Sequence, residues 1–537
     1  MISIIASILV LAQAQAVVPP ALTSEQWRAD LSYLASEWSK RHKNLFHNVT
    51  ESEWRSAVMR LDSEIPKLQR HQIIVEIGRL AGMIKDSHTG IGTFRQEAIA
   101  FHRLPIEARN LSDGVFIVRT APEYKHLLGA RILAVGNGDV AAALDSVAKV
   151  ISSDPGNPMR ARDVGPIMLG MPEVMQAFHF VPSILEIPLT IETGGKRSAV
   201  VIKPVTLNEY QSIKWVEWAH ATPLALSSPD RKFWYTYLPA DRMMYVQINE
   251  MDNDSTEYLA ETFQKAVAVT DSVPVDRFVI DLRYNSGGSS SAVTPMIQSI
   301  VRSPKIDQHG RLFVLIGRVT ASAAQNFVND LERFTNAVLI GEPTAQNPNF
   351  YSDGYGITLP NSKIQAFNAV IWSQFASRET RTYSAPSVVA EWSSADMRDG
   401  RDPGLLAVKA YAWSKPLPAR VVEVANRLGV SAGGDSLAAI AKTGVQRYRN
   451  LSRDMIRYSF DQLWTNGRSS DAIRLLESNA AAFPDDWNSH DALAGGYENK
   501  GRFADALREY QRAEQLNPTH EGIRDGIKRV KARILSP

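Results

Sequence analysis

Cysteine is absent from all 537 residues of the sequence. Disulfide bonds, thiolate nucleophiles, iron–sulfur clusters and cysteine-ligated zinc sites are therefore excluded together. Export from the cytosol is not excluded, because disulfides are permitted but not required outside it. A large charge excess is also absent, since 59 Lys and Arg residues stand against 57 Asp and Glu residues. Nucleic-acid-binding domains carry a strong basic excess, so this near balance argues against that class of protein.

Long uncharged apolar runs are absent except at the N-terminus. No later stretch reaches the roughly 18 residues that a membrane-spanning helix needs. Residues 1–11 are apolar and uncharged, and Ala14-Gln15-Ala16 has the small-x-small form of a signal-peptidase site. We therefore predict a signal peptide over 1–16, cleaved after Ala16, and a periplasmic or secreted protein with no stable membrane span. The run has no Lys or Arg, and the alternative is a buried N-terminal strand or a short anchor.

Motifs for metals, phosphates and dinucleotides are lacking as well. The 11 histidines are scattered, without the His-x-x-x-His or His-Glu-x-x-His spacing of a zinc site. No Walker loop is present, and no Gly-x-Gly-x-x-Gly opens a helix after a strand. The sequence therefore predicts neither a metal nor a cofactor.

What is present is the composition of a folded protein, with 44% apolar and 22% charged residues. Residues 17–103 are predicted to form an N-terminal helical lobe. Two capping boxes, Thr23 to Gln26 and Thr50 to Glu53, each precede apolar residues at helical spacing. A third helix is expected over about 68–85, ending at the segment DSHTG of residues 86–90.

The pattern changes at residue 104. Short apolar alternations over 104–205 predict a small β-rich module, in which residues 127–138 resemble the central strand and turn of a PDZ-type domain. Residues 232–413 alternate short buried strands, at 278–280, 312–316 and 337–340, with segments of helical length. That order indicates a βαβ arrangement with a largely parallel sheet, and the chain as a whole is predicted to be a multidomain α/β protein.

Residues 450–537 show a helical repeat. The 34-residue unit that ends at Pro518 has the residue types of a tetratricopeptide repeat, and a degenerate unit ends at Pro484. A plain helical hairpin is the alternative. The residues at the marked positions of the second unit are Leu493, Ala494, Tyr497, Ala506, Tyr510 and Ala513.

Two glycines follow the strand at 278–280, in the segment DLRYNSGG of residues 281–288. Adjacent glycines at a strand end let the backbone approach a ligand with its N–H groups exposed, as an oxyanion hole requires. Gly287 and Gly288 are therefore candidates for that role, and an ordinary Gly-rich turn is the alternative.

Ser322 lies at a helix start, directly after the strand at 312–316. A serine there can cap the helix. It can also be a nucleophile on a strand-to-helix turn, where the N–H of Ala323 would join the glycine N–H groups in holding an oxyanion.

The segment DLRYNSGG, the segment TASAA of residues 320–324 and the closing segment LIGEPT of residues 339–344 together resemble the C-terminal-processing and tricorn-core serine peptidases. The order of these segments and the strand before each one match as well. The resemblance implies a crotonase-like catalytic core, Ser322 as nucleophile, and an oxyanion hole from Gly287 or Gly288 with the N–H of Ala323.

The same resemblance bears on the general base. The processing-protease branch uses a lysine, and the corresponding position here is Asn347. The tricorn branch uses a histidine preceded by serine, and Ser87-His88 has that form. A neutral imidazole with a pKa of about 6.5 can accept the serine proton at physiological pH. We therefore expect His88 to be the base and Ser87 to orient it.

The resemblance also implies a carboxylate behind Ser87. Glu379 is the first candidate, because it lies shortly before residues 385–388, APSV, which resemble the closing segment of the family. Glu342 and Asp353 are the alternatives.

These observations predict an exported serine peptidase that forms an acyl-enzyme on Ser322 and acts on a peptide or protein substrate without a cofactor. The C-terminal repeats are expected to recruit a protein partner or a polypeptide substrate. The competing hypothesis is a non-catalytic binding protein on the same fold, in which the repeats do the recognition.

Overall fold

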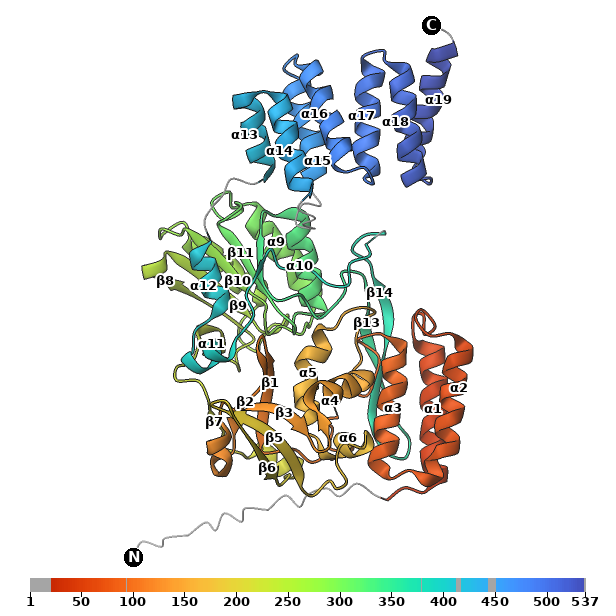
Figure 1. Ribbon diagram of the computed structural model, residues 1–537, viewed down its shortest axis with the longest axis vertical. Coiled ribbons are helices and arrows are strands. Elements are labelled where there is room, and N and C mark those ends of the chain that lie inside the picture. Colours follow the sequence, from red (N-terminus) through yellow and green to blue (C-terminus); the bar gives the residue numbers. More distant parts are fainter. Residues whose placement is uncertain (1–20, 93, 378, 412–416, 443–450, 536–537) are drawn as a thin grey trace, which may run out of the picture. The chain divides into compact units, whose positions relative to one another are not determined.

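The computed structural model describes residues 21–92, 94–377, 379–411, 417–442 and 451–535 (Figure 1). The predicted signal peptide, 1–16, lies outside the described residues. The chain divides into two compact units, Met1–Tyr411 and Ala412–Pro537. No helix among the described residues is long and apolar enough to cross a membrane.

Three helices form the N-terminal lobe of the first unit. They are α1 (Ser24–Arg41), α2 (Glu51–Glu64) and α3 (Arg70–Ile84). Both predicted capping boxes are confirmed: Thr23 with Gln26, and Thr50 with Glu53. Helix α3 is apolar on most of its surface and is buried accordingly. It ends at Lys85, whose left-handed conformation turns the chain into residues 86–90.

An antiparallel sheet follows, as the alternating pattern predicted. Its strand order is β1-β2-β3-β5-β6, with β4 paired to β3 and β7 paired to β2. Helices α4 (Val140–Val147), α5 (Met159–Leu169) and α6 (Pro172–Ala177) are inserted between β4 and β5, and α7 (Leu207–Gln211) follows β6. The strands are β1 (Ile106–Leu111), β2 (Gly114–Thr120), β3 (Arg131–Val135), β4 (Gly138–Asp139), β5 (Ile187–Thr193), β6 (Lys196–Ile202) and β7 (Val216–Glu217).

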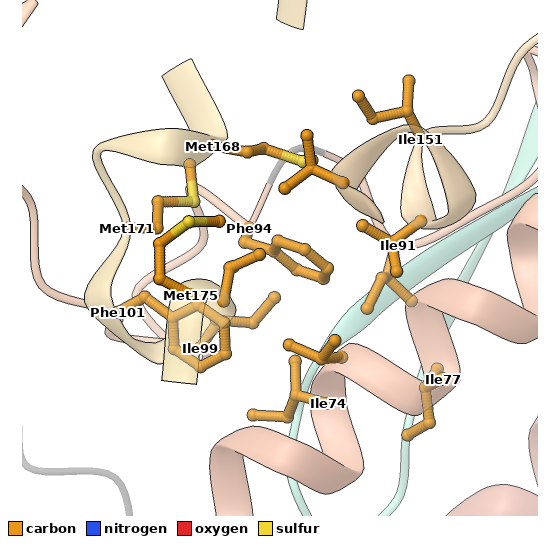
Figure 2. Packing of buried hydrophobic residues seen from close by; sticks show 14 of the residues in the cluster. Ile74, Ile77, Ile91, Phe94, Ile99, Phe101, Ile151, Met168, Met171 and Met175 are labelled. Carbon is orange, nitrogen blue, oxygen red and sulfur yellow. The ribbon is translucent and has the colours of Figure 1, made fainter. Parts of the chain in front are cut away.

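The helical lobe and this sheet share one hydrophobic core. Figure 2 shows Ile74 and Ile77 of α3 packed with Phe94, Phe101 and Met175. All five side chains are at most 1% exposed. The loop that follows α3 is therefore held by a core that extends over both segments.

The catalytic segment predicted from the sequence contains a six-stranded sheet of order β15-β12-β11-β10-β9-β8. All neighbours are parallel except β8 and β9, so the predicted largely parallel sheet is confirmed. Alternate residues of the strands face opposite layers: one face packs on α8, α9 and α10, and the other packs on α12. The strands are β8 (Phe233–Leu238), β9 (Met243–Ile248), β10 (Arg277–Asp281), β11 (Leu312–Ile316), β12 (Val338–Gly341) and β15 (Val388–Val389). The helices are α8 (Leu259–Val269), α9 (Val293–Val301), α10 (Ala323–Phe334), α11 (Ser394–Asp399) and α12 (Pro403–Ala410).

A separate hairpin, β13 (Phe350–Thr358) with β14 (Gln365–Ser373), connects this segment to the helical lobe. Both strands contact α1 (Figure 1). Phe367 of β14 also pairs with Gly90 in the loop after α3. The hairpin therefore fixes that loop by backbone pairing, and it also contributes Ile357, Leu359, Ile364 and Ala366 to the shared core.

The second unit consists of helices that stand side by side in chain order (Figure 1). The six marked repeat residues lie on α17 and α18, are all buried and belong to one cluster that extends from α16 to α19. Helices α13 and α14 precede the expected start of this segment. The helices are α13 (Leu417–Leu428), α14 (Val430–Lys442), α15 (Leu451–Tyr458), α16 (Ser469–Ala482), α17 (Trp487–Asn499), α18 (Phe503–Leu516) and α19 (Glu521–Leu535).

A buried ion-pair network holds the loop that follows β10. The Arg283 guanidinium donates to Asp402 through two nitrogens, at 2.7 and 2.8 Å, and to Asp281 at 2.6 Å. The three side chains are at most 7% exposed. Because Asp402 caps α12, the network joins the loop after β10 to the helix that packs on one face of the sheet.

We expect Arg283→Met to lower the free energy of unfolding of the first unit by about 3–5 kcal/mol, because two buried carboxylates lose their cation. Urea denaturation followed by tryptophan fluorescence would measure the change. The matched control is Lys305→Met, which breaks an exposed pair with Asp271 and should cost about 1 kcal/mol or less. Equal small losses in the two variants would contradict a structural role for the network.

Candidate active site

Ser322 occupies the turn between β11 and α10. Its backbone has φ +55° and ψ −124°, a region that non-glycine residues rarely adopt and that commonly marks functional sites. Its side chain makes no capping hydrogen bond to the helix. The capping explanation for this serine is therefore wrong, and its hydroxyl is presented at the N-terminus of α10.

Gly287 of the DLRYNSGG segment lies against this turn, and Gly288 lies against Met251 and Asp252. A Cβ on Gly287 would lie 2.5 Å from Ser322 Cβ, and a Cβ on Gly288 would lie 2.9 Å from an Asp252 oxygen. Both glycines have φ values, +120° and +130°, that side-chain-bearing residues rarely adopt. Only glycine fits at these positions.

Backbone N–H groups around Ser322 fall into two sets. The Gly287 N–H donates to Asn285 Oδ1 at 2.9 Å, and the Ser322 N–H donates to Gln346 Oε1. Within the part of the chain that the structure describes, the N–H groups of Gly288 and Ala323 have no acceptor. Of the predicted oxyanion-hole donors, Gly288 and Ala323 are therefore free to bind a ligand, whereas Gly287 is engaged.

His88 and Ser322 meet although 234 positions separate them in the sequence. His88 Nε2 lies 3.1 Å from Ser322 Oγ. The loop after α3 holds the histidine: its backbone N–H donates to Asp86 Oδ1 at 2.8 Å, and its ring stacks on Phe350 of β13. The fold thus brings together the two residues that the sequence analysis paired.

Burial is the main influence on the ionisation of His88, and it lowers the pKa of the imidazole below 6.5. The negative charge of Asp86 opposes this shift, and the positive charge of Arg160 adds to it. The ring is therefore neutral at neutral pH and able to accept a proton.

Ser87 and Gln346 lie behind the imidazole. Ser87 Oγ is 3.3 Å from His88 Nδ1, and the Gln346 amide nitrogen donates to Ser87 Oγ at 2.7 Å. The same amide accepts from the Ser322 N–H through its oxygen. Gln346 therefore connects the nucleophile turn to the serine behind the histidine. The sequence analysis missed this role, because it considered only the neighbouring Asn347 at this position.

A buried carboxylate that the sequence analysis also missed, Asp154, completes this arrangement. It accepts from the backbone N–H of Ser87 at 3.0 Å and from that of Asn347 at 3.1 Å. Burial and, to a smaller extent, the negative charge of Asp86 raise the pKa of Asp154 to about 6, although the hydrogen bonds from the backbone N–H groups of Asn347 and Ser87 oppose the rise. A loop aspartate before Pro155 has no local signature, so only the fold identifies it.

Two of the three carboxylates that the sequence analysis proposed are paired with arginines, and the third is exposed near His88. Glu379 forms an ion pair with Arg381 at 3.0 Å, and Glu342 pairs with Arg318. Asp353 is exposed on β13. No hydrogen bond between described residues joins any of them to Ser87 or His88. The structure thus gives no support for Glu379 in the relay, because its carboxylate is held by the neighbouring arginine.

The described residues contain no group of three or more His, Asp or Glu side chains placed to hold a metal ion.

Comparisons with known proteins bear on this arrangement. Residues 242–368 match the family model of peptidase family S41, and residues 428–524 match that of the bacterial transcriptional activator domain. No curated protein matches the chain. Mature CPAF shares the fold at 14% identity, with a TM-score of 0.51, over 72% of this chain and 97% of its own. CPAF complexed with lactacystin gives 15% identity and a TM-score of 0.50, over 72% and 98%.

The segment matched by the family model contains all three motifs that carried the predicted resemblance. The resemblance is therefore confirmed: this chain is a serine-type peptidase, and its residues 242–368 match the model of peptidase family S41.

Proposed function

We propose that this protein is an exported peptidase that cleaves peptide bonds through an acyl-enzyme on Ser322, with His88 as general base. The observation that carries the proposal is the 3.1 Å contact between His88 Nε2 and Ser322 Oγ. His88 removes the hydroxyl proton while Ser322 Oγ attacks the substrate carbonyl carbon. The imidazolium then gives that proton to the leaving amine, and water hydrolyses the ester.

Hydrogen bonding behind His88 supports this direction of proton transfer. If Nε2 accepts from Ser322, Nδ1 carries the ring proton, and Ser87 Oγ is the acceptor within reach. Ser87 Oγ also accepts from Gln346, which leaves its own proton for another acceptor, and Asp154 lies beside it because it accepts from the Ser87 backbone N–H at 3.0 Å. We therefore assign the relay as Ser322, His88, Ser87 and Asp154, with Asp154 in the role first assigned to Glu379. The negative charge of Asp154 stabilises the imidazolium that forms during the reaction.

The oxyanion of the tetrahedral intermediate needs donors that are fixed before it forms. The free N–H groups belong to Ala323, which follows Ser322, and to Gly288, which follows the glycine packed on Ser322. The N-terminus of α10 adds a favourable dipole. We assign the oxyanion hole to these two groups. Gly287 serves by its lack of a side chain, which gives Ser322 Cβ the room it occupies.

In a non-catalytic binding protein, the nucleophile, the base and the oxyanion donors would not need to lie close together. Their convergence on one turn argues for catalysis. For the second unit we propose recruitment of protein substrates or partners through its repeat helices, because it has a hydrophobic core of its own and lies outside the peptidase core.

Fluorophosphonate labelling tests the proposed nucleophile and base. We expect wild-type protein to be labelled and Ser322→Ala and His88→Ala to lose labelling. Protonated His88 cannot act as a base, so the rate should fall as the pH drops through the pKa of His88. Because burial lowers that pKa, the midpoint should lie below 6.5. The controls are Ser198→Ala and His126→Ala, two exposed positions, and equal labelling of Ser322→Ala and wild type would contradict the proposal.

The relay assignment predicts different effects for two carboxylates. Asp154→Asn should slow labelling by about 10- to 100-fold, because the imidazolium loses its stabilising charge. Glu379→Gln should change the rate by less than about twofold. As the folding control, the circular dichroism spectrum of each variant is compared with that of wild type. The reverse order of effects would return the role to Glu379.

Deletion of residues 412–537 tests the proposed recruitment. Labelling of Ser322 should persist, because the first unit has its own cores. Hydrolysis of unfolded protein substrates such as casein should fall several-fold, as expected when an attached docking site is removed. Unchanged turnover of every protein substrate would show that recruitment lies elsewhere.

A further inference from the structure

A second histidine, His42, contacts the loop that carries His88. It caps the C-terminus of α1, and it has no part in the reaction steps proposed above. Its Nε2 lies 2.9 Å from Oδ2 of Asp86, and both side chains are completely buried. Asp86 is the first residue of the segment DSHTG. Helix α1 is therefore joined through this imidazole to the loop of the proposed general base.

The hydrogen bonds of His42 fix the position of its ring proton. The backbone N–H of Asn44 donates to Nδ1 at 2.9 Å. A ring nitrogen that accepts a hydrogen bond carries no proton, so the proton is on Nε2. The contact between His42 and Asp86 is therefore a hydrogen bond that the imidazole donates and the carboxylate accepts.

The Asp86 carboxylate accepts two further hydrogen bonds, both from its own loop. Oδ1 accepts from the backbone N–H of His88 at 2.8 Å, and Oδ2 accepts from the hydroxyl of Thr89 at 2.6 Å. That hydroxyl in turn accepts from the backbone N–H of Ala369 on β14 at 3.0 Å. Buried polar groups need such partners, and His42 supplies Asp86 with one from outside the loop. The direction of the carboxylate, and with it the backbone of His88, therefore depends on His42.

Aromatic contacts hold the His42 ring in place. His47 stacks on it, with ring centroids 5.9 Å apart and planes inclined by 10°, and the Tyr351 ring of β13 lies 5.4 Å away. Phe350, the residue before Tyr351, stacks on His88. His42 and His88 therefore pack on neighbouring residues of one strand, which fixes the two rings relative to each other.

We propose that His42 is a positioning residue for the general base: by donating to Asp86, it fixes the loop that directs the His88 imidazole at Ser322. This inference rests on the function proposed above and adds to it a residue of the N-terminal helical lobe. Proton transfer needs the two reacting atoms within about 2.6–3.2 Å of each other. The observed separation of 3.1 Å leaves little room for displacement of the loop.

Two amide substitutions of His42 test this proposal by fluorophosphonate labelling. In His42→Gln the amide nitrogen can take the place of Nε2 and donate to Asp86, so this variant should retain most of the wild-type rate. His42→Asn carries the same amide on a side chain too short to reach Asp86. Its labelling should slow by about 10- to 100-fold, because a displaced base does not meet Ser322 in the reactive geometry.

Two further variants accompany this pair. His42→Phe, which keeps a ring but has no donor, should be as slow as His42→Asn. The matched control is His71→Asn, which removes another buried histidine of the helical lobe, one that bonds to Gln176, and which should be labelled at the wild-type rate. Melting temperatures establish that each variant is folded at the temperature of the assay.

A double variant tests whether His42 acts through Asp86. If it does, His42→Asn combined with Asp86→Asn should be labelled no more slowly than Asp86→Asn alone, because the two residues form one interacting pair. Two independent losses of structure would instead multiply their effects on the rate.

Three results would overturn the inference while leaving the proposed nucleophile in place. They are wild-type rates in both His42→Asn and His42→Phe, an equal loss in His71→Asn, and multiplied losses in the double variant. Failure to label wild-type protein is a different result, because it removes the proposed nucleophile and with it any role for His42 in positioning the base.

Discussion

The contact between His88 and Ser322 is the interaction on which the rest of this account depends. The two residues belong to different layers of the first unit: one follows a helix of the N-terminal lobe, and the other precedes α10 of the parallel-sheet core. Their 3.1 Å separation requires both layers to be fixed within a fraction of an ångström. The hydrophobic core shared by α3, the antiparallel sheet and the β13–β14 hairpin supports the histidine loop. The hairpin also pairs with Gly90 and stacks Phe350 on His88.

Hydrogen bonds between the loops also fix the positions of the reacting residues. Gln346 bonds to the backbone of Ser322 and to the hydroxyl of Ser87, so one amide sets the spacing between nucleophile and base. Asp154 approaches from the loop before α5 and binds Ser87 and Asn347. A site assembled from several distant segments of the chain depends on the packing of all of them, which explains why its strained serine backbone can persist.

The sequence was most informative where chemistry depends on neighbours in the chain. The paired glycines stand at the end of a strand, Ser322 stands at the start of a helix, and Ser87 directly precedes His88. Each of these features can therefore be recognised from residues that are adjacent in the sequence. The parallel sheet and the capped helices were predictable from periodicity for the same reason. Asp154 and Gln346 left no such pattern, because their roles come from contacts with residues 67 and 259 positions away. Glu379 was proposed from a resemblance in spacing, whereas its side chain is held by the adjacent Arg381. The hairpin was missed because a two-stranded ribbon within an α/β segment has no periodicity that separates it from the sheet strands.

A crystal structure of the protein after reaction with a fluorophosphonate would test the central claim most directly. The account predicts phosphorus bonded to Ser322 Oγ, with the phosphonyl oxygen about 2.7–3.1 Å from the N–H groups of Gly288 and Ala323. His88 Nε2 should remain within hydrogen-bonding distance of the modified oxygen. Modification of another residue, or a phosphonyl oxygen turned away from both N–H groups, would contradict the assignment of Ser322, His88 and the oxyanion hole.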